Sequence, residues 1–384
     1  MTKEIQQTQT FGQKAKKYLK EMPKRYFITA FSGMAQGLFV TLIAGTILAT
    51  IATEIIGTGN YIGQTLLYIA NIAKSLMGAG IGVGIAYALG KNKLLIFSAA
   101  VAGMIGAFAD KLLFGSFMGA MFPSVVAPFT SITLKVPGNP IGAYVLAMLT
   151  IEIVGLYAGK TKLDIILIPL GTLILSLVGI FVAAPFIWLI NQLGDLIAIA
   201  TNFAPVPMGI FIAVVMGILL TMPTSSAAIW VAVSSTVSAG NEQAMLIAGG
   251  AATVGCACHM VGFAVASYRE NGFSGLIAQG LGTSMLQIPN IMVKPIIMLP
   301  MIISSAILGA FAPVFGLMCS SSGGGMGTSG LVGVIDLFTN TSGTLGIIGI
   351  ILLMFVLPAL LNLVISEFMR KKGWIKFGDM KLPD

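Results

Sequence analysis

A dense set of hydrogen-bonding groups lies at residues 319–330, CSSSGGGMGTSG, in this chain of 384 residues. From Ser320 to Gly330 every residue except Met326 is Gly, Ser or Thr. Glycines let a ligand approach the backbone, and hydroxyl and backbone N–H groups supply hydrogen bonds. No Lys-Ser/Thr pair ends the segment, so it is not a phosphate-binding loop. It is either a loop outside the membrane or part of a binding site, for which the predicted contacts are Ser321, Gly324 and Thr328.

Two charged residues lie inside apolar stretches. Glu152 is in GAYVLAMLTIEIVGLYAGK, and Lys74 is in IANIAKSLMGAG. A charge inside a membrane helix is costly, so it must face the protein interior, pair with an opposite charge or be neutralised. We expect Glu152 to lie near a solute path and to form a buried ion pair with Lys74. The alternatives are a purely structural pair, or a lysine that extends to the membrane surface.

Three further polar side chains are candidates for solute contacts. His259, the only histidine, offers one donor and one acceptor, which suits a hydroxylated ligand. Asn139 lies in a turn forced by LKVPGNPIG, and Asn290 lies in LQIPN. Cys256 and His259 share a helix face, but two ligands from one helix are too few for a metal site. We expect neither a metal nor any other cofactor, and we assign no catalytic residues.

The elements that carry these residues are membrane helices. Apolar runs recur along the chain that exceed the roughly 20 residues needed to cross a bilayer. Backbone groups in lipid must pair within the chain, which predicts an all-α polytopic membrane protein with about 8–10 transmembrane helices. The predicted spans lie near 27–56, 62–90, 94–110, 141–158, 163–190, 244–268, 296–318 and 344–368.

Four stretches between these spans contain Pro or a Gly/Ser cluster, and we expect them to be broken or re-entrant hairpin segments. Non-helical backbone at membrane depth is tolerated where protein buries it or where it lines a cavity, and transporters build their sites from broken helices. The pattern therefore favours a transporter over a structural or signalling membrane protein. The four stretches are 111–135, 205–237, 275–295 and 319–343.

Basic residues gather at the two ends of the chain. Residues 1–26 hold seven Lys/Arg and the last fifteen residues hold five, which by the positive-inside rule predicts both termini in the cytoplasm. The division we expect is a basic segment at 1–26 that is interfacial, a membrane domain at 27–368 and a basic tail at 369–384. Because the basic residues lie beside membrane spans, the partner we expect for them is lipid headgroups and not nucleic acid. The expected location is a bacterial cell membrane.

Four strings carry a family resemblance: VPGNPIGAYV at 136–145, GKTKLDIILIP at 159–169, TMPTSSAAI at 221–229 and CSSSGGGMGTSGLVG at 319–333. Over roughly 25–370 the chain resembles the membrane-embedded IIC component of the bacterial phosphoenolpyruvate-dependent sugar phosphotransferase system, in a stand-alone form. The resemblance implies about ten helical elements with re-entrant hairpins, a homodimer, a sugar in an occluded pocket, and cytoplasmic IIB and IIA partners.

The chain departs from related sugar permeases in one respect. Those proteins carry an acidic residue in a Glu-Pro context in the hairpin that closes over the sugar, whereas this hairpin has none and the nearest acid is Asp336. We expect a permease for a small polar solute that works by alternating access. The alternatives are a secondary transporter of an organic anion or other solute without phosphotransfer, and a ligand-sensing membrane regulator.

Overall fold

A computed structural model describes residues 21–113, 138–222, 226–235 and 237–382. All regular structure within these residues is helical, which confirms the predicted all-α class. Four of the described helices are long and apolar enough to cross a membrane, or five if one bent pair is counted as a single span. Four shorter apolar helices accompany them. The predicted broken segment at 111–135 and most of the predicted N-terminal segment lie outside the described residues.

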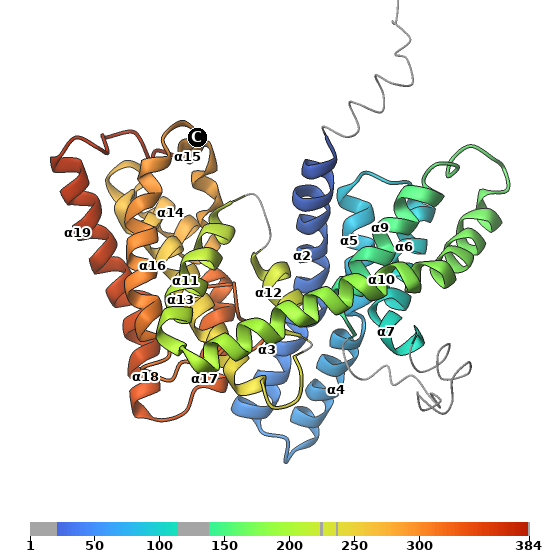
Figure 1. Cartoon of the computed structure of the whole chain (residues 1–384), viewed down its shortest axis with the longest axis horizontal. Helices are drawn as coiled ribbons and strands as arrows, with labels where there is room; N and C mark the ends of the chain where they lie inside the picture. Colours follow the sequence, from blue (N-terminus) through green and yellow to red (C-terminus); the bar gives the residue numbers. More distant parts are fainter. Residues whose placement is uncertain (1–20, 114–137, 223–225, 236, 383–384) are drawn as a thin grey trace, which may run out of the picture.

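The first lobe holds the described helices between residues 24 and 154, on the right of Figure 1. Its helices approach closely through small residues, as membrane helices do: a Cβ on Gly84 of α5 would lie 2.1 Å from the carbonyl oxygen of Gly33 on α2. The elements are η1 (Lys24–Ala30), α2 (Phe31–Leu38), η2 (Phe39–Ile43), α3 (Ala44–Thr50), η3 (Ile51–Ile56), α4 (Tyr61–Ser75), α5 (Met77–Ala88), α6 (Lys93–Ala107), α7 (Ala109–Lys111) and α9 (Pro140–Val154).

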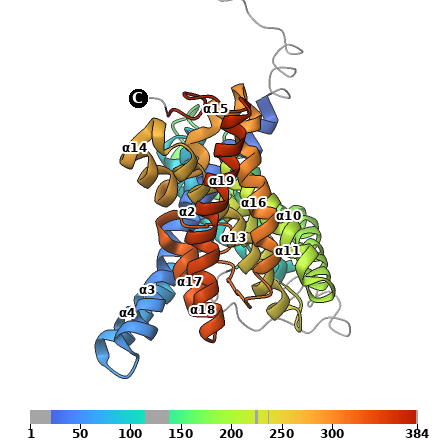
Figure 2. The same ribbon diagram turned by 90° about the vertical axis from the view of Figure 1, so that its left-hand side faces the viewer.

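The predicted single span at 62–90 is wrong in one respect. The helix breaks at Leu76, and α4 and α5 meet there at 51°. Leu76 leaves the helical range with ψ 7°, and Gly78 and Gly80, which follow, have low helix propensity. As a result α3 and α4 project from one end of the lobe (Figure 2).

Helix α10 (Asp164–Phe203) joins the two lobes and is longer than the predicted 163–190. Its 40 residues correspond to about 60 Å, twice the hydrocarbon thickness of a bilayer, so it cannot cross perpendicular to the membrane. It runs obliquely from one lobe to the other in Figure 1. Near the end of α10, Asp195 accepts hydrogen bonds from the backbone N–H and the hydroxyl of Ser238.

The second lobe holds the described helices from residue 205 onward. Its centre is α13, which is buried along most of its length and packs against α11 and α16. The elements are α11 (Pro205–Thr221), α12 (Ser226–Ser234), α13 (Glu242–Ala266), α14 (Tyr268–Ile277), η5 (Ala278–Gly282), η6 (Ser284–Gln287), α15 (Ile288–Val293), η7 (Pro295–Met298), α16 (Leu299–Phe311), η8 (Ser329–Leu331), α17 (Val332–Asn340), α18 (Thr344–Ile351), η9 (Leu352–Val356) and α19 (Leu357–Lys371).

Three of the predicted broken segments are irregular, as expected. The described residues of 205–237 form two helices, 275–295 contains only short helical turns after α14, and 319–343 holds a loop followed by η8 and α17. Helix α12 lies between the lobes (Figure 1), and its residues belong to both hydrophobic cores: Val231 to that of the first lobe and Trp230 to that of the second. The described ends of the chain, with the α5–α6 and α9–α10 connections, lie at the same end of the molecule.

Candidate functional site

The Gly/Ser segment is buried inside the molecule. Every residue from Ser322 to Thr328 is shielded from solvent, and Met326 packs with Ile47 of the first lobe. Gly327 lies against α13, where a Cβ would come within 2.8 Å of Cys256. The segment, called the Gly/Ser hairpin below (319–330), is therefore an internal element and not the outside loop that was the alternative interpretation.

Helix α12 holds one side of the hairpin. Trp230 is 2% exposed, and its indole Nε1 donates a hydrogen bond of 3.2 Å to the carbonyl oxygen of Ser320. A Cβ on Gly324 would overlap that indole at 1.9 Å, so only glycine fits against the ring. The Ser226 hydroxyl donates to the carbonyl oxygen of Gly325 at 2.7 Å, and Gly325 has φ +77°, which glycine adopts without strain.

The carboxylate of Asp336 holds the start of the hairpin. Its Oδ1 accepts from the Ser320 hydroxyl at 2.7 Å, and its Oδ2 accepts from the Ser320 backbone N–H and from the Cys319 thiol. Asp336 is 7% exposed, and a Cβ added to Gly323 would lie 2.4 Å from the Cβ of Asp336. Sequence reasoning noted Asp336 only as the nearest acid. Its position in the apolar string VGVIDLF was the signal that it is buried and bonded.

The end of the hairpin is tied to the irregular segment that follows α14. The hydroxyl of Thr328, which is fully buried, donates to the carbonyl oxygen of Gly280, and the hydroxyl of Ser329 donates to that of Gly282 at 2.9 Å. The predicted site residue Thr328 is thus in the hairpin but uses its hydroxyl for a structural bond. Gly324, as shown above, also serves packing.

Ser322 lies at the boundary between the lobes, and Ser321 precedes it. The hydroxyl of Ser322 lies 3.2 Å from that of Thr46 on α3, which is a direct polar contact between the two lobes. Ser321 is half-buried, and its hydroxyl has no hydrogen-bond partner within the described part of the chain. Among the hairpin residues predicted to contact a solute, Ser321 is the one whose side chain is available.

His259 lies in a second polar cluster, where α13 faces α11. Its Nδ1 is 2.8 Å from the hydroxyl of Thr221, which is 2.9 Å from that of Ser284. Its Nε2 is fully buried without a partner among the described residues and faces Gly217 of α11. No group of three possible metal ligands occurs in the described residues.

Two predicted contacts serve structure elsewhere. Asn139 is 2% exposed, and its side-chain oxygen accepts from the N–H groups of Ile141 and Gly142 as the N-cap of α9. The amide of Asn290 donates to the Gln287 side chain and to the carbonyl oxygen of Lys381 near the C-terminus. Turn chemistry identified both residues as special, but it could not distinguish a cap or a chain contact from a ligand contact.

Glu152 pairs with Arg25 and not with the predicted Lys74. The Arg25 Nε donates to Glu152 Oε1 at 2.7 Å, at a position two residues before the end of α9. Lys91 lies nearby, and the pKa of its amine is lowered overall. Burial is the largest cause and the Arg25 charge adds to it, while the Glu152 charge acts in the opposite direction. Lys74 instead packs beside Gly45 of α3. The pairing was missed because Arg25 was counted only as a cytoplasmic flanking charge, 127 residues away along the chain.

The hairpin region offers hydroxyl groups, carbonyl oxygens and one carboxylate that is already bonded, and this donor set suits an uncharged polar ligand. The family model described as "Phosphotransferase system, EIIC" matches residues 28–382. No curated protein matches the sequence. With almost the whole chain covered by that model, and an all-helical fold with broken segments between its spans, this protein belongs to the EIIC family of the phosphotransferase system.

Proposed function

We propose that this EIIC-family membrane transporter moves a small, uncharged, hydroxylated solute of the sugar class, bound where the Gly/Ser hairpin meets α12 between the lobes. One observation carries the proposal: the largely buried hairpin is rich in backbone and hydroxyl groups, contacts the first lobe through Ser322, and carries at Ser321 a half-buried hydroxyl without a hydrogen-bond partner among the described residues. Hydroxyl and amide groups are what recognise a neutral polyol. An organic anion would need a cation, and among the described residues no lysine or arginine bonds the hairpin.

The proposed mechanism is alternating access. Transporters expose a fixed midplane site to either side by rocking one bundle against the other. In this chain the rocking parts are the first and second lobes, and the contact between Thr46 and Ser322 is one that must break and reform. Family membership implies association with IIA and IIB components, and we propose that a IIB protein phosphorylates the solute on release.

We also propose that both termini are cytoplasmic. The described ends share one end of the molecule with the basic loops at Lys91–Lys93 and Lys160–Lys162 (Figure 1), as the positive-inside rule requires. The test is Lys372→Cys with the native cysteines replaced: an impermeant thiol reagent added outside the cell should not label it. A homodimer is proposed from the family resemblance and is tested by the mass of the purified protein in detergent.

The decisive experiment for the solute is a thermal-shift screen of purified protein against mono- and disaccharides, polyols and organic anions. A ligand that binds the folded state raises the melting temperature. Ser321→Ala should weaken binding of the hit about fivefold, which corresponds to about 1 kcal/mol for one lost hydrogen bond, without changing the melting temperature of the free protein. The matched control is Ser274→Ala on the exposed face of α14.

The outcomes separate the competing functions. A sugar hit followed by uptake that yields phosphorylated product supports the proposal. Uptake of an organic anion, driven by an ion gradient and without phosphorylated product, would replace it with the secondary transporter. Binding of a ligand without any uptake into vesicles would favour the sensor. Unchanged affinity in Ser321→Ala would move the solute away from the Gly/Ser hairpin.

A further inference from the structure

The described residues that follow α19 pack against the second lobe. After α19 the chain turns at Gly373 and Gly378, both with positive φ, and folds back over the second lobe. Ile375 and Met380 are at most 1% exposed and belong to one hydrophobic cluster with Phe263 of α13. Residues 373–382 are called the C-terminal strap below.

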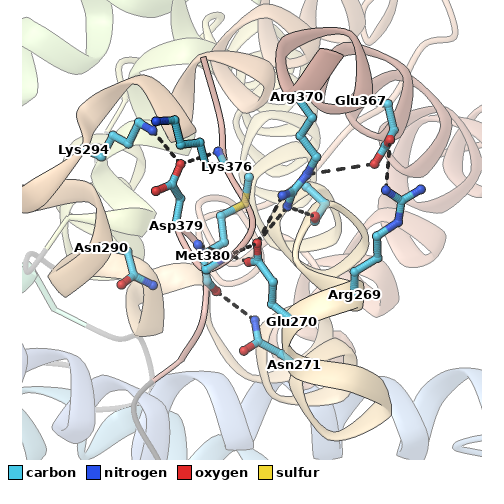
Figure 3. Close-up of polar contacts among 12 residues, drawn as sticks. Arg269, Glu270, Asn271, Asn290, Lys294, Glu367, Arg370, Lys376, Asp379 and Met380 are labelled. Atoms are coloured by element: carbon cyan, nitrogen blue, oxygen red, sulfur yellow. Dashed lines mark hydrogen bonds and ion pairs between the residues drawn. The ribbon is translucent and has the colours of Figure 1, made fainter. Parts of the chain in front are cut away.

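Polar side chains of α14 hold one side of the strap (Figure 3). The side chain of Glu270 is 1% exposed, accepts from Arg370 at 3.1 Å, and also accepts from the backbone N–H groups of Gly378 and Met380. Next to it, Asn271 donates to the Met380 carbonyl oxygen and accepts from the Leu382 N–H. All of these contacts with the strap are made to its backbone atoms, so they depend on the path of its backbone and not on its side chains.

The other side of the strap is held by the segment around α15. Lys294 Nζ lies 2.6 Å from Asp379 Oδ2, the amide of Asn290 donates to the Lys381 carbonyl oxygen, and the amide of Gln287 donates to that of Met380. The strap therefore joins the end of α13–α14 to the irregular segment that follows it.

A line of hydrogen bonds continues from the strap to the Gly/Ser hairpin. The buried amide of Gln287 donates to Met380 and also to the side-chain oxygen of Gln279 at 2.8 Å. Gln279, also fully buried, precedes Gly280, whose carbonyl oxygen accepts from Thr328 of the hairpin. The intervening residues of η5 and η6 form no continuous α-helix, so these side-chain bonds are what fixes their position.

We propose that the C-terminal strap is a built-in latch on the solute site: docked on Glu270, Asn271 and Gln287, it holds η5, η6 and the Gly/Ser hairpin in place, and its release loosens the hairpin. The proposal rests on the proposed function for its consequence, because the hairpin is the proposed site. A molecule that binds or displaces the strap at its end of the protein would thereby change solute binding at the hairpin. This is coupling through a contiguous hydrogen-bonded network.

The test is hydrogen–deuterium exchange of the full protein, of a truncation after Lys372, and of Asn271→Ala. We expect amides of the hairpin and of residues 278–287 to exchange at least tenfold faster in both variants, with α5 and α6 unchanged. The side-chain bonds that Asn271→Ala removes both go to the strap, at Met380 and Leu382, so this variant decides the matter if the truncated protein does not fold. The matched control is Phe377→Ala, because Phe377 belongs to the strap but is 77% exposed.

Exchange does not depend on any solute, so the latch and the proposed function fail separately. Faster exchange of the strap and the hairpin in Asn271→Ala supports the latch even if no sugar ever binds. Unchanged exchange of the hairpin, with the strap removed or loosened by Asn271→Ala, overturns the latch even if Ser321 proves to bind a sugar. Equal loosening in Phe377→Ala would also overturn it, since that change removes no contact to α14 or η6.

Discussion

At the scale of single residues, the shape of the proposed site depends on groups that do not touch the solute. The Asp336 carboxylate accepts three hydrogen bonds from Cys319 and Ser320 and has almost no contact with solvent. A buried carboxylate is tolerated only when such donors replace water. Asp336 therefore acts as the anchor of the hairpin, and Ser321, the next residue along, depends on it for its position.

Asp336→Asn should lower the stability of the protein by about 1–3 kcal/mol, because an amide NH2 would face a donor of Ser320 where an oxygen now accepts. The measurement is the melting temperature in detergent, with exchange of the hairpin amides as a local readout. Thr339→Ala is the matched control, since Thr339 is exposed on the same helix. A melting temperature for Asp336→Asn equal to that of the control would contradict the anchor role.

The same residues show what sequence reasoning can reach. The composition of 319–330 predicted a special internal element, and its burial confirms that interpretation. The partner of Glu152 could not be predicted, because ion pairing depends on three-dimensional proximity and Arg25 lies 127 residues away. Similarly, nothing in LQIPN indicated that Asn290 binds the backbone of Lys381. The type of a residue indicates that it forms hydrogen bonds, whereas the identity of its partners depends on the three-dimensional fold.

At the scale of elements, α12 holds the hairpin from one side. Trp230 provides both a flat surface for Gly324 and a hydrogen bond to Ser320, while Ser226 fixes Gly325. Because α12 also packs into the core of the first lobe through Val231, a movement between the lobes would displace the hairpin. The proposed site thus depends on an irregular segment and a helix that are distant in sequence.

Trp230→Phe should keep the ring against Gly324 but remove the donor to Ser320. We expect loss of about 1 kcal/mol of stability for the hydrogen bond, together with faster amide exchange at 319–325. Trp188→Phe is the control, since Trp188 is 63% exposed on α10. If both variants lower the melting temperature equally, the contact between α12 and the hairpin contributes nothing specific.

The docking of the strap has a predictable pH dependence. Burial raises the pKa of Asp379, but the bonds from Lys294 and from the Lys376 N–H, with the charges of Lys294 and Arg370, bring it below its ordinary value of 3.8. A carboxyl whose pKa is lower in the docked state stabilises that state above its ordinary pKa, and the stabilisation is lost as the pH falls through the lower value.

Docking should therefore be constant from pH 8 to 5 and weaken only below about pH 4. The measurement is the anisotropy of a dye on Phe377→Cys, with the native cysteines replaced. Asp379→Asn is the reference: its docking should be weaker at pH 7 and should lack this transition. A midpoint between pH 5 and 7 in the unmutated strap would show that another group controls docking.

Sequence periodicity predicted some elements closely and others poorly. The predicted span at 244–268 matches α13 at 242–266, because an apolar run flanked by polar residues has clear ends. The predicted end at 190 for α10 is wrong by thirteen residues, since the helix continues through Asp195, which bonds Ser238 without interrupting it. Length and hydropathy can identify a helix that crosses the membrane once. They cannot show that a helix continues obliquely beyond the length of one crossing.

At the scale of the whole molecule, two lobes with separate hydrophobic cores are joined by α10, by α12 and by contacts at the hairpin. Separate cores allow the lobes to move as units, because close-packed interiors transmit displacement instead of absorbing it. The contact between the hydroxyls of Thr46 and Ser322 crosses this boundary through only two side chains. It is consequently the place where alternating access can be tested directly.

Thr46→Cys combined with Ser322→Cys should place two thiols at the position of hydroxyls 3.2 Å apart, close enough for a disulfide, with the three native cysteines replaced. We expect an oxidant to cross-link the lobes and to stop uptake by vesicles, and a reductant to restore it. The control pair is Thr46→Cys with Ser329→Cys, because Ser329 faces Gly282 on the other side of the hairpin and should not cross-link. Normal uptake by a fully cross-linked protein would mean that the lobes do not separate here during transport, and a mechanism that rocks the first lobe against the second would have to be abandoned.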